Sequence, residues 1–366
     1  MKKEKNKTPL HFCSSLSGSI WEISSHLAVE FQKHFNLTCE FLNESPEKKE
    51  VLLLHFLDPS IVRHEEFKKF KKKILIQPID GTIIKKDVVD LFNEFDLIIS
   101  PANASRNILQ ENGVTTKIKI IPNYYDSSLF DSIKKQKIEK YIPKDKFIFY
   151  HESTLHPRKG IEFLYEGFVK AFSDTKHVND VVLIVKDNLY NIGNFKKIER
   201  LKRETIKLQK KYTNPANILK FSSYLNEEEL KVLWEYTHCY ATMAKIEGFG
   251  IPMLRFNLLE KPILCLNNKN SGYNDYLKNG MDCHMIPTKQ IIAEDEFMWL
   301  YEKETEWAVP NIDDVVSGFR YCFNHHDDML NDFQFIKRNH EMKEKKYLFQ
   351  NVIKNYVNVI EDELNS

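Results

Sequence analysis

One short stretch of the sequence, residues 245–255, combines a carboxylate with a glycine-rich turn. It reads Lys-Ile-Glu-Gly-Phe-Gly-Ile-Pro-Met-Leu-Arg and follows an apolar run at residues 239–243. This order predicts a strand, a turn at Gly248 and Gly250, and a helix that starts near Pro252, because proline is well tolerated in a first helical turn. The free backbone amides at the start of such a helix suit an anion, most naturally a phosphate.

Glu247 stands just ahead of this turn. A carboxylate has the wrong charge for holding a phosphate, so we expect it to bind hydroxyl groups or to lie near a developing positive charge. The alternative is that Gly-x-Gly before a helix serves only as a tight connection, which is common in α/β proteins.

A second group of candidate residues lies about ninety residues earlier in the sequence. Arg158 and Lys159 stand beside Gly160, ahead of a helix predicted for residues 161–172. Two cations at this position can stabilise the negative charge of a diphosphate leaving group. The alternative is that both are solvated residues of a first helical turn. Their occurrence together with the 245–255 stretch favours the binding interpretation.

The sequence resembles the donor site of retaining glycosyltransferases with the GT-B fold, glycosyltransferase family 4 (glycosyl transferases group 1). The resemblance rests on Glu-Gly-Phe-Gly-Ile-Pro-Met-Leu at 247–254, Lys-Pro-Ile-Leu at 261–264 and Asn-Ser-Gly-Tyr-Asn-Asp-Tyr-Leu at 270–277. It implies that Lys159 binds the donor phosphates and that Glu247 holds a sugar hydroxyl. It also implies that a glycine-rich turn meets the donor through its backbone, here Gly248, Phe249, Gly250 and Ile251.

Two positions depart from the family pattern. The family has a second Glu after seven further residues, which holds the ribose hydroxyls, and this chain has Arg255 there. The family also has an Arg about six residues before the Lys, where this chain has Ser153. Arg158 is a candidate substitute for that Arg. We predict that Arg255 contacts the nucleotide directly, as a cation in place of the carboxylate.

The rest of the chain contains two series of short apolar segments separated by helical stretches. The first series covers residues 9–15, 51–57, 74–77, 95–100 and 118–122, and the second covers 146–150, 181–185, 218–222, 239–243 and 262–266. Such alternation is typical of parallel sheets covered by helices. We therefore predict an α/β protein with two Rossmann-like domains, whose ligands lie beyond the carboxyl ends of the strands.

The resemblance places these domains in a GT-B arrangement with a cleft between them. We predict an acceptor domain at residues 1–140, a donor domain at 141–340 and a C-terminal helix at 341–366 that crosses back onto the first domain. Residues 131–145, which are rich in lysine and lack apolar periodicity, are predicted to form the linker. Residues from 297 onward are predicted to be helical.

Three further segments supply other candidates. Ser17 and Gly18 belong to a predicted turn between the first strand and its helix, where backbone amides could meet the donor; the alternative is an ordinary strand-to-helix turn. Asp80 follows a predicted strand and matches a region where the family often has a polar residue for the acceptor, although Asp-Gly is more often a turn. Ser222 and Tyr224 are candidates near the nucleotide base, on the loop before a helix whose start is marked by the Asn-Glu-Glu-Glu sequence at 226–229.

Composition excludes several classes of protein. The 366 residues include 53 basic and 52 acidic side chains, so no overall charge attracts nucleic acid or a membrane. No apolar window reaches the length of a membrane span, and the start does not resemble a secretory signal. Six cysteines without a Cys-x-x-Cys pair favour reduced thiols, a cytoplasmic location and the absence of zinc. The lack of an Asp-x-Asp motif is consistent with the metal-independent GT-B class.

Together with these observations, the resemblance implies a cytoplasmic, metal-independent, retaining glycosyltransferase. It needs no cofactor, and a UDP- or GDP-sugar is the expected donor. The acceptor is left open among a glycan, a lipid-linked sugar, a protein and a modified nucleic-acid base; peripheral membrane contact and the oligomeric state are also left open. The alternative from another class is a catalytically inactive GT-B protein that binds a nucleotide sugar or a partner, motivated by Arg255 and Ser153. A dehydrogenase is disfavoured because no Gly-x-Gly-x-x-Gly follows the first strand.

Overall fold

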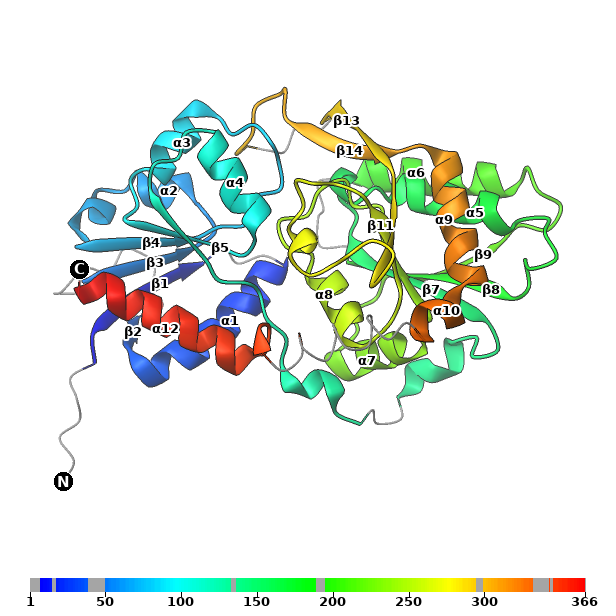
Figure 1. The fold of residues 1–366 in the computed structure, drawn as a ribbon, viewed down its shortest axis with the longest axis horizontal. Helices are drawn as coiled ribbons and strands as arrows, with labels where there is room; N and C mark the ends of the chain where they lie inside the picture. Colours follow the sequence, from blue (N-terminus) through cyan, green and yellow to red (C-terminus); the bar gives the residue numbers. More distant parts are fainter. Residues whose placement is uncertain are drawn as a thin grey trace.

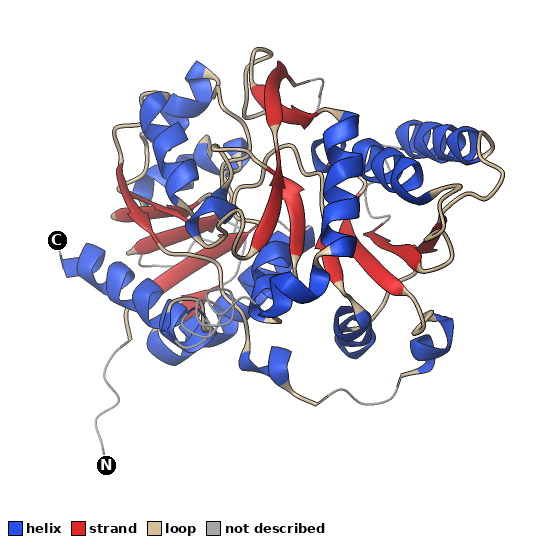
Figure 2. Ribbon diagram, turned by 45° about the vertical axis from the view of Figure 1, so that its right-hand side comes forward, coloured by secondary structure: helices blue, strands red, loops and turns tan. Residues whose placement is uncertain are grey.

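The chain forms two α/β units that lie side by side in the computed structural model (Figure 1). The structure describes residues 7–14, 18–38, 50–132, 136–188, 195–293, 299–331, 342 and 345–365. Each unit contains a six-stranded sheet, and every strand pairing within the two sheets is parallel. Helices surround both sheets (Figure 2).

The first sheet has the strand order β2-β1-β3-β4-β5-β6. Its strands are short apolar runs, and all residues of β3 are buried, as expected for a strand covered on both faces. The strands are β1 (Pro9–Ser14), β2 (Asn36–Thr38), β3 (Val51–His55), β4 (Lys72–Ile76), β5 (Leu97–Ser100) and β6 (Lys117–Ile120). The helices of this unit are α1 (Gly18–His34), α2 (Pro59–Val62), α3 (Lys86–Phe92) and α4 (Asn103–Glu111).

The second sheet has the order β12-β11-β10-β7-β8-β9. Its strands are β7 (Phe147–Thr154), β8 (Val181–Asn188), β9 (Asn217–Phe221), β10 (Cys239–Ala241), β11 (Ile263–Leu266) and β12 (Cys283–Ile286). Its helices are α5 (Ile161–Phe172), α6 (Phe195–Gln209), α7 (Glu227–Tyr236), α8 (Ile251–Leu258), α9 (Ile312–Asn324) and α10 (His326–Asn331). The start of α7 is the predicted capping box, in which the side chains of Asn226 and Glu229 each accept a hydrogen bond from the other residue's backbone amide.

The last helix, α12 (Phe349–Asn365), returns to the first unit (red in Figure 1). Its apolar residues Val352, Tyr356 and Ile360 belong to the same buried cluster as Leu10 of β1 and Phe31 of α1. This packing confirms the prediction that the C-terminal helix crosses back. The predicted domain boundaries at residues 140 and 340 remain predictions.

Two features differ from the predictions. Residues 306–310 are not helical: they form β14 (Glu306–Pro310), which pairs antiparallel with β13 (Thr288–Ile292). Trp307 and Val309 favour a strand and are buried together with Ala308, whose amide donates to the Lys245 carbonyl.

The second difference concerns the predicted linker. It contains a short 3₁₀ helix, Lys137–Tyr141, whose Ile138 is buried in the core of the second unit.

In the described part of the chain no helix is long and apolar enough to span a bilayer.

Candidate functional site

Arg158 and Lys159 end a 3₁₀ turn, Pro157–Lys159, that follows the carboxyl end of β7. Gly160 then begins α5 with a φ of 60°, in the left-handed region that favours glycine. A Cβ atom at this position would lie 2.0 Å from the Met243 carbonyl oxygen. Gly160 therefore lets the turn pack closely on the segment that follows β10, so both cations face residues 245–250.

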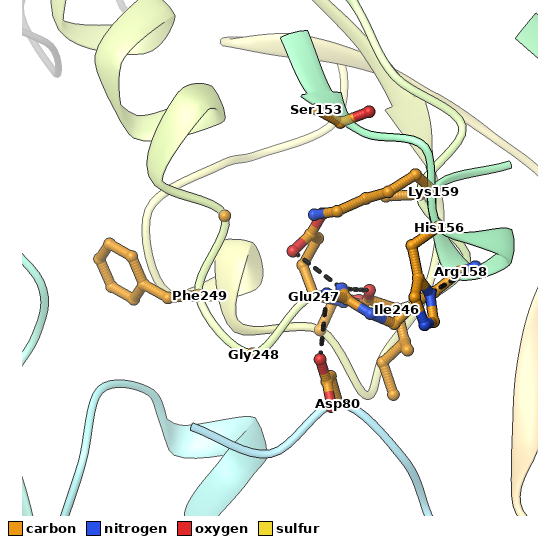
Figure 3. A network of polar contacts seen from close by, with 12 residues as sticks. Asp80, Ser153, His156, Arg158, Lys159, Ile246, Glu247, Gly248 and Phe249 are labelled. Carbon is orange, nitrogen blue, oxygen red and sulfur yellow. Dashed lines mark hydrogen bonds and ion pairs between the residues drawn. The ribbon is translucent and has the colours of Figure 1, made fainter. Parts of the chain in front are cut away.

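The predicted turn of residues 248–250 leads into α8, with Gly250 as the N-terminal cap at a φ of 86°. Pro252 occupies the first turn of the helix, which begins one residue earlier, at Ile251. Tyr276 fixes the turn, since its hydroxyl donates to the carbonyls of Phe249 and Gly250 at 2.9 and 2.6 Å. The Phe249 ring is buried and points away from Glu247 (Figure 3), so any contact of Phe249 with a donor must use its backbone.

Gly248 has a second role that the sequence did not indicate. A Cβ atom there would lie 2.9 Å from Pro78 Cβ and 3.2 Å from the Ile79 carbonyl oxygen, both in the first unit. The Gly248 carbonyl also accepts a hydrogen bond from Ser105 at 3.3 Å. The glycine therefore permits close approach between the two halves of the protein at the site.

Four of the predicted residues come together in one charged cluster (Figure 3). Lys159 Nζ lies 2.5 Å from Glu247 Oε1, and Arg158 Nη1 lies 3.1 Å from Glu247 Oε2. Arg158 Nη2 reaches across to the first unit and lies 3.1 Å from Asp80 Oδ2. Arg158 Nη1 also donates to the Ile246 carbonyl at 2.7 Å. Arg158 thus lies between two carboxylates, one from each half of the chain, and Lys159 pairs with one of them, Glu247.

The pKa values of this cluster follow from burial and pairing. Burial opposes the charged form of Glu247, but Lys159 and Arg158 outweigh it and lower the Glu247 pKa to about 2. Burial, together with the nearby charge of Arg158, lowers the pKa of Lys159 despite its pairing with Glu247. Burial would also lower the pKa of Arg158, but Asp80 and Glu247 reverse this and raise it. The carboxylate of Glu247 is therefore ionised at neutral pH.

Arg255 forms a separate ion pair within the protein. Its Nη1 pairs with Glu152 Oε1, and its guanidinium carbon lies 4.0 Å from the centre of the Trp234 ring. The other oxygen of Glu152 accepts hydrogen bonds from Tyr150 Oη and Trp234 Nε1, both at 2.9 Å. The predicted contact of Arg255 with a nucleotide stays a prediction. The structure adds that a carboxylate, Glu152, stands beside this arginine.

Ser153, at the position where the resembled family has an arginine, binds a buried histidine. The Nδ1 atom of His151 lies 2.8 Å from the Ala241 carbonyl, so Nδ1 carries the proton, and Nε2 accepts from Ser153 Oγ at 2.8 Å. Burial lowers the pKa of His151 to about 4, which keeps it neutral. Ser153 therefore supplies no charge to the site.

The remaining candidates are not among the ion-paired residues of the charged cluster. Ser222 and Tyr224 are on the predicted loop between β9 and α7, and Tyr224 is 77% exposed. Gly18 is the first residue of α1, and Ser17 lies outside the described residues. Among the residues that the structure describes, no group of three His, Cys, Asp or Glu side chains could hold a metal ion.

Sequence reasoning missed two residues of this region. Glu152 lies inside β7, which continues to Thr154 and so is longer than predicted. Its separation from Arg255 by about a hundred residues gave no local signal of their pairing. Tyr301, which binds Asp80, lies in the segment wrongly predicted as helical.

Comparison with known proteins supports the fold and gives one family match within the chain. Residues 132–304 match the family model described as glycosyl transferases group 1. No curated protein sequence gives a significant match. Among solved structures, Anabaena HepE in complex with UDP and glucose is similar with a TM-score of 0.70 at 13% identity, covering 97% of this chain and 99% of that one.

Two other solved structures show the same architecture. Sucrose-phosphate synthase from Thermosynechococcus elongatus has a TM-score of 0.71 at 9% identity, covering 97% of this chain and 99% of that one. The pneumococcal O-GlcNAc transferase GtfA, in complex with UDP and GlcNAc, has a TM-score of 0.58 at 13% identity, covering 87% of this chain and 58% of that one. The two sheets, the returning helix and these similarities show a GT-B fold, as predicted.

Proposed function

We propose that this protein is a retaining glycosyltransferase of family 4 type that moves a sugar from a nucleoside-diphosphate sugar to an acceptor hydroxyl. The observation that carries the proposal is the cluster of Lys159, Arg158 and Glu247 beside the turn of residues 248–250, with Asp80 facing it from the other half. The match of residues 132–304 to glycosyl transferases group 1 supports it. So do UDP complexes of proteins with this fold.

The cluster suits the charges that develop during such a transfer. Breaking the bond between the anomeric carbon and the phosphate oxygen leaves its electron pair on the diphosphate and positive charge on the sugar ring. Lys159, Arg158 and the first-turn amides of α8 stabilise the diphosphate, and Glu247 holds a sugar hydroxyl near the positive ring. The acceptor oxygen forms the new bond from the side of the leaving group. Attack from this side retains the anomeric configuration without a covalent nucleophile. The proton of the acceptor hydroxyl passes to the departing phosphate.

The proposal also assigns roles to the other candidate residues. Asp80 lies on the first unit and binds the acceptor hydroxyl. Arg255 contacts the nucleotide, with Ser222 and Tyr224 near its base and the turn at Ser17 and Gly18 near the donor. The transfer uses a UDP- or GDP-sugar and requires no metal ion or other cofactor. The acceptor is a glycan, a lipid-linked sugar, a protein or a modified base, and the reaction takes place in the cytoplasm.

The test is release of nucleoside diphosphate from a panel of UDP-, GDP- and ADP-sugars. We expect at least one donor to be turned over by the wild-type protein and Glu247→Ala to slow that turnover about a hundredfold. Lys86→Ala, which removes an exposed lysine that pairs with Asp90 and not with the cluster, serves as the matched control and should leave the rate unchanged. If no donor is turned over, and Glu247→Ala releases no less nucleoside diphosphate than the wild type, the proposal that the protein is an enzyme is wrong.

The second candidate is a GT-B protein that binds a nucleotide sugar or a partner without turnover. Its specific support is the pairing of Arg255 with Glu152 and the neutral Ser153–His151 pair at two positions where the family has charged donor-binding residues. Binding of a nucleotide sugar without diphosphate release in the same panel would favour this candidate.

A further inference from the structure

Tyr301 holds Asp80 by two hydrogen bonds. Its hydroxyl accepts from the Asp80 backbone amide at 2.8 Å and donates to Asp80 Oδ1 at 3.0 Å. Tyr301 is only 4% exposed, and burial together with the Asp80 carboxylate raises its pKa well above the ordinary value, so the hydroxyl keeps its proton. One side chain therefore fixes both the backbone and the carboxylate of Asp80.

The ring of Tyr301 accounts for the glycine that follows Asp80. A Cβ atom on Gly81 would lie 2.6 Å from Tyr301 Cδ1, which is closer than side-chain atoms approach one another. Gly81 is not among the residues with positive φ, so no left-handed turn requires it. The Asp-Gly sequence could be interpreted as a simple turn. Here the glycine instead leaves room for the ring of Tyr301, which comes from a distant segment.

Neighbouring residues extend this contact between the segments 80–85 and 300–306. Thr305 Oγ1 accepts hydrogen bonds from the amides of Thr82 and Ile83 at 2.8 and 3.1 Å. The Glu302 amide donates to the Ile83 carbonyl at 2.9 Å, and the Lys85 amide donates to the Leu300 carbonyl at 3.0 Å. The backbone of the loop after β4 is thus held along its length by the segment before β14.

Asp80 connects this contact to the charged cluster. Its Oδ1 accepts a hydrogen bond from the Tyr301 hydroxyl. Its Oδ2 pairs with Arg158, which in turn pairs with Glu247. The Asp80 side chain remains 33% exposed, so its carboxylate is accessible to a ligand. Without Tyr301, Arg158 would be the side chain that orients this carboxylate, and it would draw Asp80 toward the cations.

We infer that Tyr301 is a positioning residue that holds the Asp80 carboxylate toward the acceptor side of the cleft, against the pull of Arg158. The inference rests on the proposed function, because it gives Asp80 the task of binding the acceptor hydroxyl. Tyr301 itself touches neither donor nor acceptor. It acts by keeping one oxygen of Asp80 away from the diphosphate-binding cations.

The kinetic test is a double-mutant cycle with Tyr301→Phe and Asp80→Ala in the full-length protein. Tyr301→Phe keeps the ring against Gly81 and removes only the hydroxyl. We expect it to lower kcat/KM for the acceptor about tenfold and to leave donor hydrolysis without acceptor within about twofold. In the Asp80→Ala background it should have almost no further effect. An equal loss in both backgrounds, or an equal loss in donor hydrolysis, would overturn the inference.

Amide hydrogen exchange supplies a readout that needs no turnover. In Tyr301→Phe the Asp80 amide should exchange at least about tenfold faster, because its acceptor is gone, while the Thr82 and Ile83 amides stay protected by Thr305. An unchanged Asp80 amide, or equally faster exchange along the whole loop, would show that Tyr301 does not position Asp80. If the wild-type protein turns over no donor, the proposed function fails, and the exchange result still decides whether Tyr301 holds Asp80.

Discussion

At the scale of single residues, the site is defined by shared charges. Glu247 is bound by both cations, and Arg158 is bound by carboxylates from both halves of the chain. Such pairing keeps buried charges ionised, because each partner offsets the desolvation of the other. A diphosphate entering this cluster would meet cations that are already in place, which reduces the reorganisation needed on binding.

The lowered pKa of Glu247 predicts how stability depends on pH. The folded-state pKa of about 2 lies below the ordinary value of 4.5, so ionised Glu247 stabilises the protein fully above pH 4.5. This contribution, on the order of 3 kcal/mol, is lost as the pH falls from about 4.5 toward 2. Denaturant unfolding of wild type and Glu247→Gln at several pH values measures it. The difference in unfolding free energy should shrink as pH falls; a difference that is constant or grows would contradict the pairing.

Arg255 gives a second prediction at this scale. Arg255→Ala leaves Glu152 without its cation and should lower the free energy of unfolding by about 2 kcal/mol. Adding Glu152→Gln removes the uncompensated charge and should recover part of this loss. Lys86→Ala, from an exposed helical pair with Asp90, should change the free energy of unfolding by less than about 0.5 kcal/mol. Unchanged stability of Arg255→Ala in urea unfolding would show that the pair contributes nothing.

The sequence allowed Glu247, Lys159, Arg158 and Asp80 to be named, because each stands next to a glycine turn or the end of a strand. It could not show that Glu152 pairs with Arg255. That contact depends on how β7 lies beside α8, and strand order is a property of the whole sheet rather than of either segment.

At the scale of elements, apolar runs and helix starts were predictable because their signals are local. The capping box at Asn226 and most strands of both sheets were confirmed. Strands β2 and β12 were missed: β2 has only three residues, and β12 interrupts its apolar residues with His284. β14 was mistaken for helix because its strand state depends on pairing with β13.

The turn before α8 gives a prediction about the stability of a Gly250 variant. Gly250→Ala would place a Cβ 2.7 Å from Met253 Cε and 2.9 Å from Tyr276 Oη, at a φ of 86°. Gly280 has a similar φ of 77° but open space around it, so Gly280→Ala measures backbone strain alone. We expect Gly280→Ala to cost about 1 kcal/mol of unfolding free energy and Gly250→Ala clearly more. Equal losses in denaturant unfolding would mean that the turn adapts to the extra methyl group.

At the scale of the whole molecule, the two units meet through the site itself. Gly248 packs against Pro78 and Ile79, and Tyr301 binds Asp80. The GT-B fold could be predicted from two successive strand series and a family resemblance. These contacts between the units could not be predicted from the sequence, because they join segments that are far apart in the chain. The packing of both sheets sets how closely those segments approach.

The central claim is that the charged cluster binds a nucleoside diphosphate through Lys159. Isothermal titration of the full-length protein with UDP and with GDP tests this most directly. We expect at least one of them to bind, Lys159→Ala to weaken that binding about tenfold or more, and Lys86→Ala to leave it unchanged. Failure of both diphosphates to bind, or equal affinity of wild type and Lys159→Ala, would contradict the claim.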